Sequence, residues 1–128
     1  MGDAFVLDYV RTPRAKASAR GSLHGHTATD LLVHLKHALV ERTGLDPARV
    51  DDVIVGCASQ VDEQGADIAR TAALLAGWGD HVPGMTINRF CASGIDAVAH
   101  AAARLRAGDL GLAVAGGVES VSRVPLFA

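Results

Sequence analysis

The alternation of short apolar runs with longer helix-like segments constrains the fold of this chain more than any other feature. The apolar runs, which have the length and β-branched content of strands, occupy residues 4–10, 50–57, 84–88 and 110–117. The helix-like segments run from a cap at Thr27 or Thr29 to Gly44, over 68–76, and over 91–107. The order β-α-β-α-β-α-β predicts an α/β fold with a mostly parallel sheet and right-handed crossovers. No repeat or linker interrupts residues 1–128, which we therefore expect to form one domain.

Two segments indicate how deeply the sheet and its helices are buried. Residues 53–55 are three consecutive branched apolar side chains, as expected for a strand that is covered on both faces. The segment 91–107 is apolar on nearly every side until Arg104 and Arg106. A helix of this kind is predicted to be buried all round, and one sheet covers only one side of it. We therefore expect a second layer over this helix, from another part of the protein or from a partner.

Composition and charge argue against several functional classes. The chain is 49% hydrophobic with a net charge of −2, and its 12 Lys and Arg are scattered rather than gathered in the stripe that nucleic-acid binding needs. No apolar run reaches the length of a membrane span, and the first residues do not read as a signal peptide. Two cysteines cannot form a disulfide framework or a zinc site, and the six histidines lack the spacing of metal ligands. We expect a cytoplasmic protein that binds no metal, nucleic acid or membrane.

Cys91 stands where an extended run gives way to a helical one, in the stretch NRFCASG over residues 88–94. The first turn of a helix has backbone N–H groups without intrahelical partners, and they carry partial positive charge. These groups favour the thiolate form of a nearby sulfur and stabilise the oxyanion that forms when a thiolate attacks a carbonyl. Cys91 is therefore a candidate nucleophile. The alternative is an inert core cysteine, which is common and is the reading we give Cys57 at the end of an apolar run.

Several motifs together resemble the N-terminal part of the thiolases, the acyl-CoA C-acetyltransferases. The resemblance covers almost the whole chain and rests on R-T-P followed by G-x-L (11–13 and 21–23), VDDVIVGC (50–57), EQGADIARTAALLAG (63–77), INRFCASG (87–94) and AGGVESVSRVP (115–125). The last two stretches are specific in combination. Ketosynthase-type condensing enzymes use the same nucleophile-on-helix arrangement, but the AGG-x-ES segment fits the thiolases better.

The resemblance implies a mechanism in which Cys91 is the nucleophile. Cys91 is expected to attack a 3-ketoacyl-CoA or an acyl-CoA thioester and to form an acyl-cysteine intermediate, which serves thiolytic cleavage or Claisen condensation. Its backbone N–H is expected to be one donor of the oxyanion hole. Coenzyme A enters as substrate or product, and no bound cofactor is implied. The family also implies a five-layer α/β/α/β/α fold, a place in acetyl-CoA and fatty acid metabolism, and homo-oligomers that are dimers or tetramers.

Residues 1–128 resemble only one part of that family. The family's histidine base in a G-H-P segment, its asparagine in N-E-A-F, its second cysteine in C-x-G-G-G and its CoA-binding loop region have no counterpart in these residues. We expect residues 1–128 to be an incomplete thiolase N-terminal domain that gives negligible turnover alone. The alternative is a non-catalytic role, as an acyl-CoA-binding or assembly fragment of the same fold.

Overall fold

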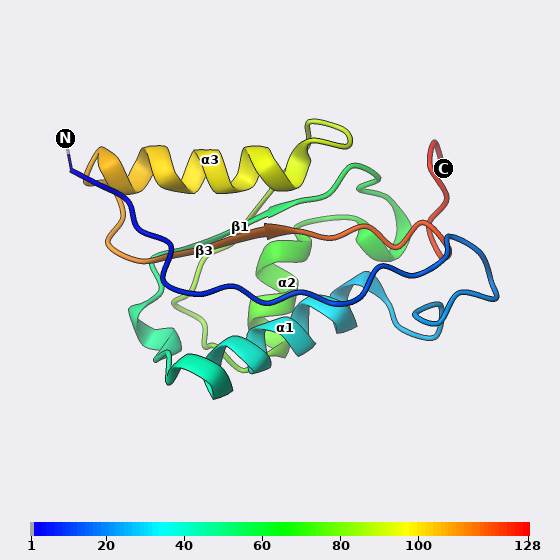
Figure 1. The fold of residues 1–128 in the computed structure, drawn as a ribbon, viewed down its shortest axis with the longest axis horizontal. Helices are drawn as coiled ribbons and strands as arrows, with labels where there is room; N and C mark the ends of the chain where they lie inside the picture. The colour runs from blue at the N-terminus through cyan, green and yellow to red at the C-terminus, as the bar shows by residue number, and fades with distance from the viewer. Residues whose placement is uncertain (1) are drawn as a thin grey trace.

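A three-stranded parallel sheet separates one helix from two others (Figure 1). The computed structural model describes residues 2–128. The strands β1 (Asp52–Gly56), β2 (Met85–Ile87) and β3 (Ala113–Gly117) lie in the order β2-β1-β3, and both pairings are parallel. The helices are α1 (Ala28–Thr43), α2 (Ile68–Leu75) and α3 (Ser93–Arg106), with 3-10 turns η1 (Pro47–Arg49) and η2 (Asp62–Gln64). The predicted α/β architecture with a mostly parallel sheet is confirmed.

The central strand β1 is covered on both faces, as its three consecutive branched residues predict. Val53 and Val55 pack in a cluster with side chains of α1 and α2, whereas Ile54 packs on the opposite face against Ala97 of α3. The three strand side chains are at most 3% exposed. Because successive side chains alternate across a strand, this one strand holds the two helical layers together.

Local signals fix both ends of α1. Thr27 and Asp30 form a capping box, in which the Thr27 hydroxyl accepts the Asp30 N–H at 3.0 Å and the Asp30 carboxylate accepts the Thr27 N–H at 2.9 Å. At the other end Gly44 adopts φ +69°, a left-handed conformation that suits glycine, and donates its N–H to Val40 O. Of the two caps that the sequence offers, Thr27 is the one that the helix uses.

The prediction of a strand over residues 4–10 is wrong. No backbone N–H of residues 3–15 donates to a backbone carbonyl within the described chain. The segment runs past β3 and α1 (Figure 1), and a cavity of about 1370 Å³ is lined by this segment on one side and by those two elements on the other. Its large apolar side chains from Phe5 to Tyr9 are exposed, Phe5 by 76%. Strand-like composition forms no ladder without a neighbouring strand at hydrogen-bonding distance, and residues 2–128 place none there.

Within the described chain the helix after Cys91 is covered on one side only, and the second layer that its apolar sequence predicts is not supplied by residues 2–128. α3 packs on the sheet through Ala97 and Ala101, which are buried, while Ile95 on another side of the helix is 79% exposed. The sheet covers one side of α3, and no further layer of residues 2–128 lies beyond it (Figure 1). The apolar outer side of this helix is therefore open to solvent in this chain.

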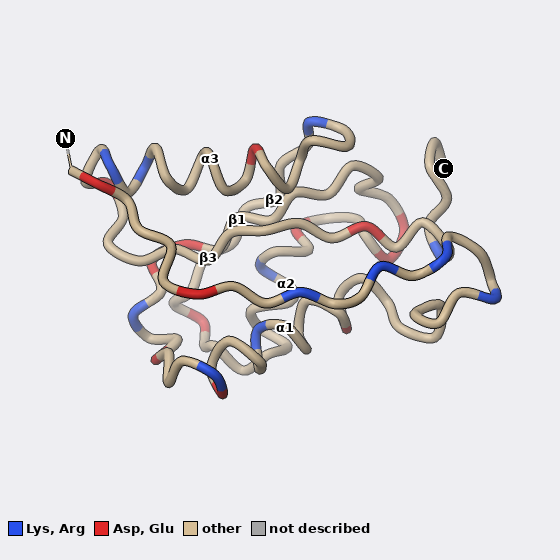
Figure 2. Tube along the Cα trace, viewed as in Figure 1, with Lys and Arg blue, Asp and Glu red and all other residues tan. Residues whose placement is uncertain are grey.

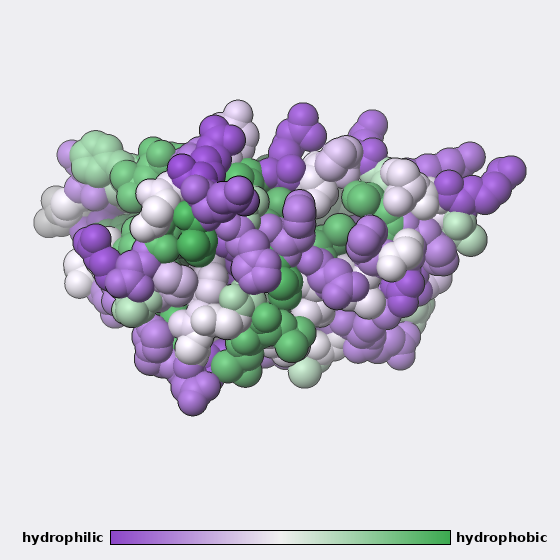
Figure 3. Space-filling model, turned by 90° about the horizontal axis from the view of Figure 1, so that it is seen from below, coloured by the Kyte–Doolittle hydropathy of each residue, from purple (hydrophilic) through white to green (hydrophobic). Residues whose placement is uncertain are grey.

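Charged and apolar side chains are mixed over the surface. Lys and Arg are interspersed with Asp and Glu along the trace rather than gathered in one stripe (Figure 2). The side of the molecule that carries α1 shows separate hydrophobic patches between hydrophilic side chains (Figure 3). Among residues 2–128, none of the helices combines the length and the hydrophobicity that crossing a bilayer requires.

Candidate active site

The turn between β2 and α3 carries Cys91. β2 ends at Ile87, residues 88–92 form the turn, and α3 begins at Ser93 with Ala92 as its N-cap. The predicted helix starts two residues earlier, so Cys91 lies just before α3 rather than at its first position. The Cys91 residue is exposed. The turn follows the carboxyl end of β2, which is the region where ligands bind in open parallel sheets.

Ser93 and Asn88 hold this turn from the two sides of Cys91. The buried Ser93 hydroxyl donates to Phe90 O at 2.6 Å and accepts the Arg89 N–H at 2.8 Å. The carboxamide oxygen of Asn88 accepts the Phe90 N–H at 2.8 Å. Two side chains therefore determine the backbone path of the residues that lead into Cys91.

Phe90, the residue directly before Cys91, adopts φ +48°. A left-handed conformation costs a residue with a side chain on the order of 1–3 kcal/mol, and it persists where surrounding contacts impose it. The hydrogen bonds from Ser93 and Asn88 both end on the Phe90 backbone and supply those contacts. Strain of this kind, beside an exposed cysteine, favours a functional role for the turn.

Two glycines allow the first turn of α3 to sit directly on the sheet. A Cβ at Gly56, the last residue of β1, would overlap the backbone of Ser93 and lie 2.6 Å from Gly94 N. A Cβ at Gly117, the last residue of β3, would lie 3.0 Å from Gly94 Cα. The ends of two neighbouring strands thus set the height of α3 above the sheet, and with it the position of Cys91.

Backbone amides at the start of α3 are available to a ligand. No side chain caps this helix, and within residues 2–128 the N–H groups of Cys91 and Gly94 have no hydrogen-bond acceptor. Arg89 of the turn forms an ion pair with α3, with its Nε 3.1 Å from Asp96 Oδ2, so its charge is balanced locally. Amide donors beside a sulfur are the arrangement that stabilises an oxyanion as it forms by attack on a carbonyl. The turn can therefore support nucleophilic acyl transfer.

Cys57 differs from Cys91 in exposure and in chemistry. Its side chain is 1% exposed and belongs to the core between the sheet and the helices α1 and α2. Burial, and after it the negative charge of Glu119, raises the pKa of Cys57 to about 11. Near neutral pH Cys57 therefore remains a thiol, which is a poor nucleophile. Of the two cysteines, only Cys91 is exposed and lies beside available amides.

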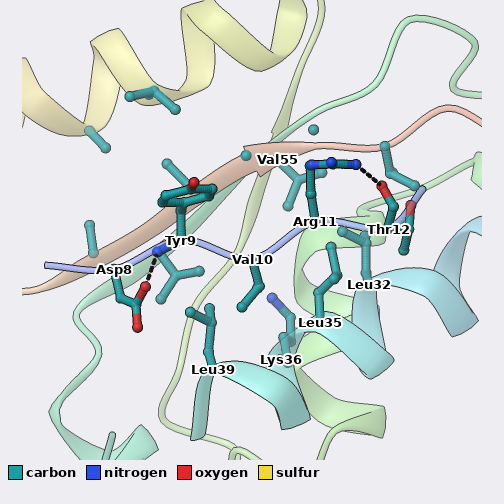
Figure 4. A pocket seen from close by; sticks show the side chains of 18 of the residues that line it. Asp8, Tyr9, Val10, Arg11, Thr12, Leu32, Leu35, Lys36, Leu39 and Val55 are labelled. Atoms are coloured by element: carbon teal, nitrogen blue, oxygen red, sulfur yellow. Dashed lines mark hydrogen bonds between the residues drawn. The ribbon is translucent and has the colours of Figure 1, made fainter. Parts of the chain in front are cut away.

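A large cavity of the described chain lies between the N-terminal segment and α1 (Figure 4). Val10 of the N-terminal segment and Leu39 of α1 are among the residues that line it. Its wall includes Lys36, whose Nζ lies 4.8 Å from the centroid of the Trp78 ring, and burial lowers the pKa of Lys36 to about 8. Cys91 and the other residues of the turn before α3 do not line this cavity.

The sequence locates Cys91 but not the contacts that hold it. The position of Cys91 between an extended run and a helix is expected from the sequence. The two hydrogen bonds of the Ser93 hydroxyl and the contact of Gly56 with α3 are not. The one local signal for that contact is a glycine at the end of an apolar run, directly before Cys57.

Comparisons with known proteins identify relatives of this chain. Residues 4–128 match the family model described as thiolase, N-terminal domain. A β-ketoadipyl-CoA thiolase of Escherichia coli is 48% identical over 126 residues, which are 98% of this chain and 31% of that protein. A steroid 3-ketoacyl-CoA thiolase of Mycobacterium tuberculosis is 40% identical over 126 residues, which are 98% of this chain and 30% of that protein.

A solved structure shares the fold. The crystal structure of the Bacillus anthracis acetyl-CoA acetyltransferase superposes with a TM-score of 0.74 and 43% sequence identity, and the match covers 80% of this chain and 26% of that one. The chain thus spans less than a third of the length of the relatives that it matches. The turn with Cys91 lies inside the residues that match the family model. The chain belongs to the thiolase family, in the part that corresponds to its N-terminal domain.

Proposed function

We propose that this chain supplies the nucleophile of an acyl-CoA C-acyltransferase, and that Cys91 carries the acyl group as a thioester. The observation that carries the proposal is the exposed Cys91 beside the available amides at the start of α3. Membership of the thiolase family supports it, because the family model covers residues 4–128.

In the cleavage direction the Cys91 thiolate attacks the keto carbon of a 3-ketoacyl-CoA, and backbone N–H groups donate to the carbonyl oxygen as it gains charge. The bond between the keto carbon and the α-carbon then breaks, and its electron pair leaves with an acetyl-CoA fragment that takes up a proton. The thiol of coenzyme A next attacks the acyl-cysteine, loses its proton, and releases the shortened acyl-CoA and the Cys91 thiolate. The reverse sequence condenses acetyl-CoA with an acyl group on Cys91.

The proposed substrate class is 3-ketoacyl-CoA. Relatives that are 44–48% identical are named β-ketoadipyl-CoA thiolases, and the solved structure is named an acetyl-CoA acetyltransferase. These names support β-ketoadipyl-CoA and acetoacetyl-CoA as the two substrates to compare. Coenzyme A is then a substrate or product rather than a resident cofactor.

We also propose a cytoplasmic homo-oligomer. β2 is an edge of the sheet, and an edge strand is able to pair with another copy of the chain. Both cysteines of the described chain are free thiols, which is typical of a reducing compartment.

The test compares the full-length protein with residues 1–128 alone, with acetoacetyl-CoA or β-ketoadipyl-CoA and coenzyme A as substrates. We expect the full-length protein to release acetyl-CoA. Residues 1–128 alone are expected to be at least about 10²-fold slower, because general acid–base catalysis by the absent groups is worth that much. A circular dichroism spectrum establishes that the shorter chain is folded. A full-length protein without acetyl-CoA release would contradict the proposed activity, and robust release by residues 1–128 would contradict the need for further groups.

A further inference from the structure

A polar network joins Glu119, two residues beyond the end of β3, to the loop that follows β1. The Glu119 carboxylate accepts the Ala58 N–H at 2.8 Å on Oε2, and the Ser59 N–H at 3.2 Å on Oε1. Oε1 also accepts the side-chain N–H of Gln64 at 3.0 Å. Among residues 2–128 no Lys, Arg or His forms an ion pair with Glu119. Amide donors therefore hold this carboxylate in place of a cationic partner, and the Cys57 thiol lies beside it.

Gln64 fixes the carboxylate from within the core. Its side chain is fully buried, at 0% exposure. Besides the bond to Glu119, Nε2 donates to Ser59 O at 2.9 Å, and Oε1 accepts the N–H of the buried Ser120 at 2.7 Å. All polar atoms of the Gln64 side chain thus have partners. A fully satisfied buried network is rigid, because any rearrangement leaves a buried polar group unpaired.

The network continues into the turn that carries Cys91. The backbone N–H of Ala58 donates to Glu119, and the backbone carbonyl of Ala58 accepts the Asn88 side-chain N–H at 3.0 Å. Asn88 in turn accepts the N–H of Phe90, the residue before Cys91. Three consecutive side-chain and backbone links therefore connect the Glu119 carboxylate to the strained residue beside Cys91.

We propose that Glu119 is a positioning residue for Cys91, and that Gln64 holds it in place. The proposal rests on Cys91 being the nucleophile. Glu119 does not touch the Cys91 turn; it fixes the loop after β1, against which Asn88 holds the turn. A carboxylate suits this task because both of its oxygens accept hydrogen bonds. The isosteric amide of Glu119→Gln has one acceptor oxygen, and its NH₂ group must face at least one of the N–H donors that the carboxylate now accepts.

The experiment uses the full-length protein with Glu119→Gln, and Glu63→Gln as the matched control. Glu63 is a neighbouring carboxylate that pairs with Arg123 and forms no hydrogen bond with Ala58 or Asn88. For Glu119→Gln we expect kcat to fall about 10- to 100-fold, because a small misplacement of a reacting group costs up to about 10²-fold. The KM for the 3-ketoacyl-CoA is expected to stay within about threefold, since substrate binding is not altered. Glu63→Gln is expected to keep kcat within about twofold, as a partly exposed pair contributes little.

A second readout separates positioning from a general loss of structure. Iodoacetamide alkylates an exposed thiol with little demand on geometry, so its rate at Cys91 is expected to change less than about threefold in Glu119→Gln. A wild-type kcat in this variant would overturn the proposal. Loss of kcat together with unfolding, seen as a cooperative transition at much lower temperature, would assign Glu119 to stability instead.

Asn88→Ala tests the same chain of contacts from its other end. Asn88 is exposed, so the variant removes the link between Ala58 and Phe90 without burying an unpaired group. We expect the same fall in kcat with an unchanged KM, and a wild-type kcat here would overturn the proposal even if Glu119→Gln does not fold. Cys91→Ala serves as the reference. Retained activity in Cys91→Ala would contradict the proposed function. An inactive Cys91→Ala together with a fully active Glu119→Gln would contradict only the role given to Glu119.

Discussion

Replacement of Cys91 by serine in the full-length protein is expected to lower kcat by about 10³-fold or more, because an alkoxide is far harder to generate near neutral pH than a thiolate. The measurement is the steady-state rate of acetyl-CoA release from a 3-ketoacyl-CoA and coenzyme A. Cys91 is exposed, so the exchange of sulfur for oxygen leaves the packing of the core unchanged.

Cys57→Ala is the control for this experiment. Cys57 is buried, and its thiol lies beside the Glu119 carboxylate and makes a long contact of 3.9 Å with Ser59 O. Loss of this thiol is expected to leave kcat within about threefold, because it is a small buried group and the amide donors that hold Glu119 stay in place. If Cys91→Ser works at nearly the wild-type rate, the thiol of Cys91 is not the nucleophile.

Gly56→Ala is expected to lower both the stability of the protein and its kcat. The added methyl group would overlap the backbone of Ser93, and backbone cannot move aside as a flexible side chain does. Overpacking at such a contact typically costs about 1–3 kcal/mol of unfolding free energy. The displaced helix start moves Cys91 and its amides relative to the ends of the strands, so we expect kcat to fall by about 10²-fold in the folded fraction. Thermal unfolding and kcat measured on the same sample separate the two effects.

Gly25→Ala is the matched control for Gly56→Ala. A Cβ at Gly25 meets no atom within 4 Å, and the residue is exposed in a loop. We expect this variant to keep the stability and the rate of the wild type. If Gly56→Ala has the same stability and the same rate as Gly25→Ala, then α3 tolerates a larger distance from the sheet, which contradicts the role given to Gly56.

The sequence predicts those parts of the fold that depend on local patterns. Residues 53–55 identify the doubly covered strand, and Thr27 and Gly44 identify the ends of α1. The segment 4–10 shows where such patterns fail. Its composition is that of a strand, but a strand also needs a partner, and within residues 2–128 none lies at hydrogen-bonding distance. Pairing is a property of the whole fold and cannot be predicted from the segment itself.

The same distinction applies to the site. Cys91 is predictable because its position before a helix follows from neighbouring residues. The bonds of Glu119 to Ala58 and Gln64 join residues 61 and 55 positions apart. They exist because β1 and β3 are neighbours in the sheet, so that the loops beyond their ends meet. No local pattern in the sequence carries that information.

The central claim is that Cys91 becomes acylated during turnover. The direct measurement incubates the full-length protein with a 3-ketoacyl-CoA in the absence of coenzyme A, quenches in acid, and locates the added acyl mass by peptide mass spectrometry. We expect the acyl group on the peptide that contains Cys91, and its loss when coenzyme A is added before the quench. An acyl group on any other side chain, with the Cys91 thiol unmodified, would contradict the account.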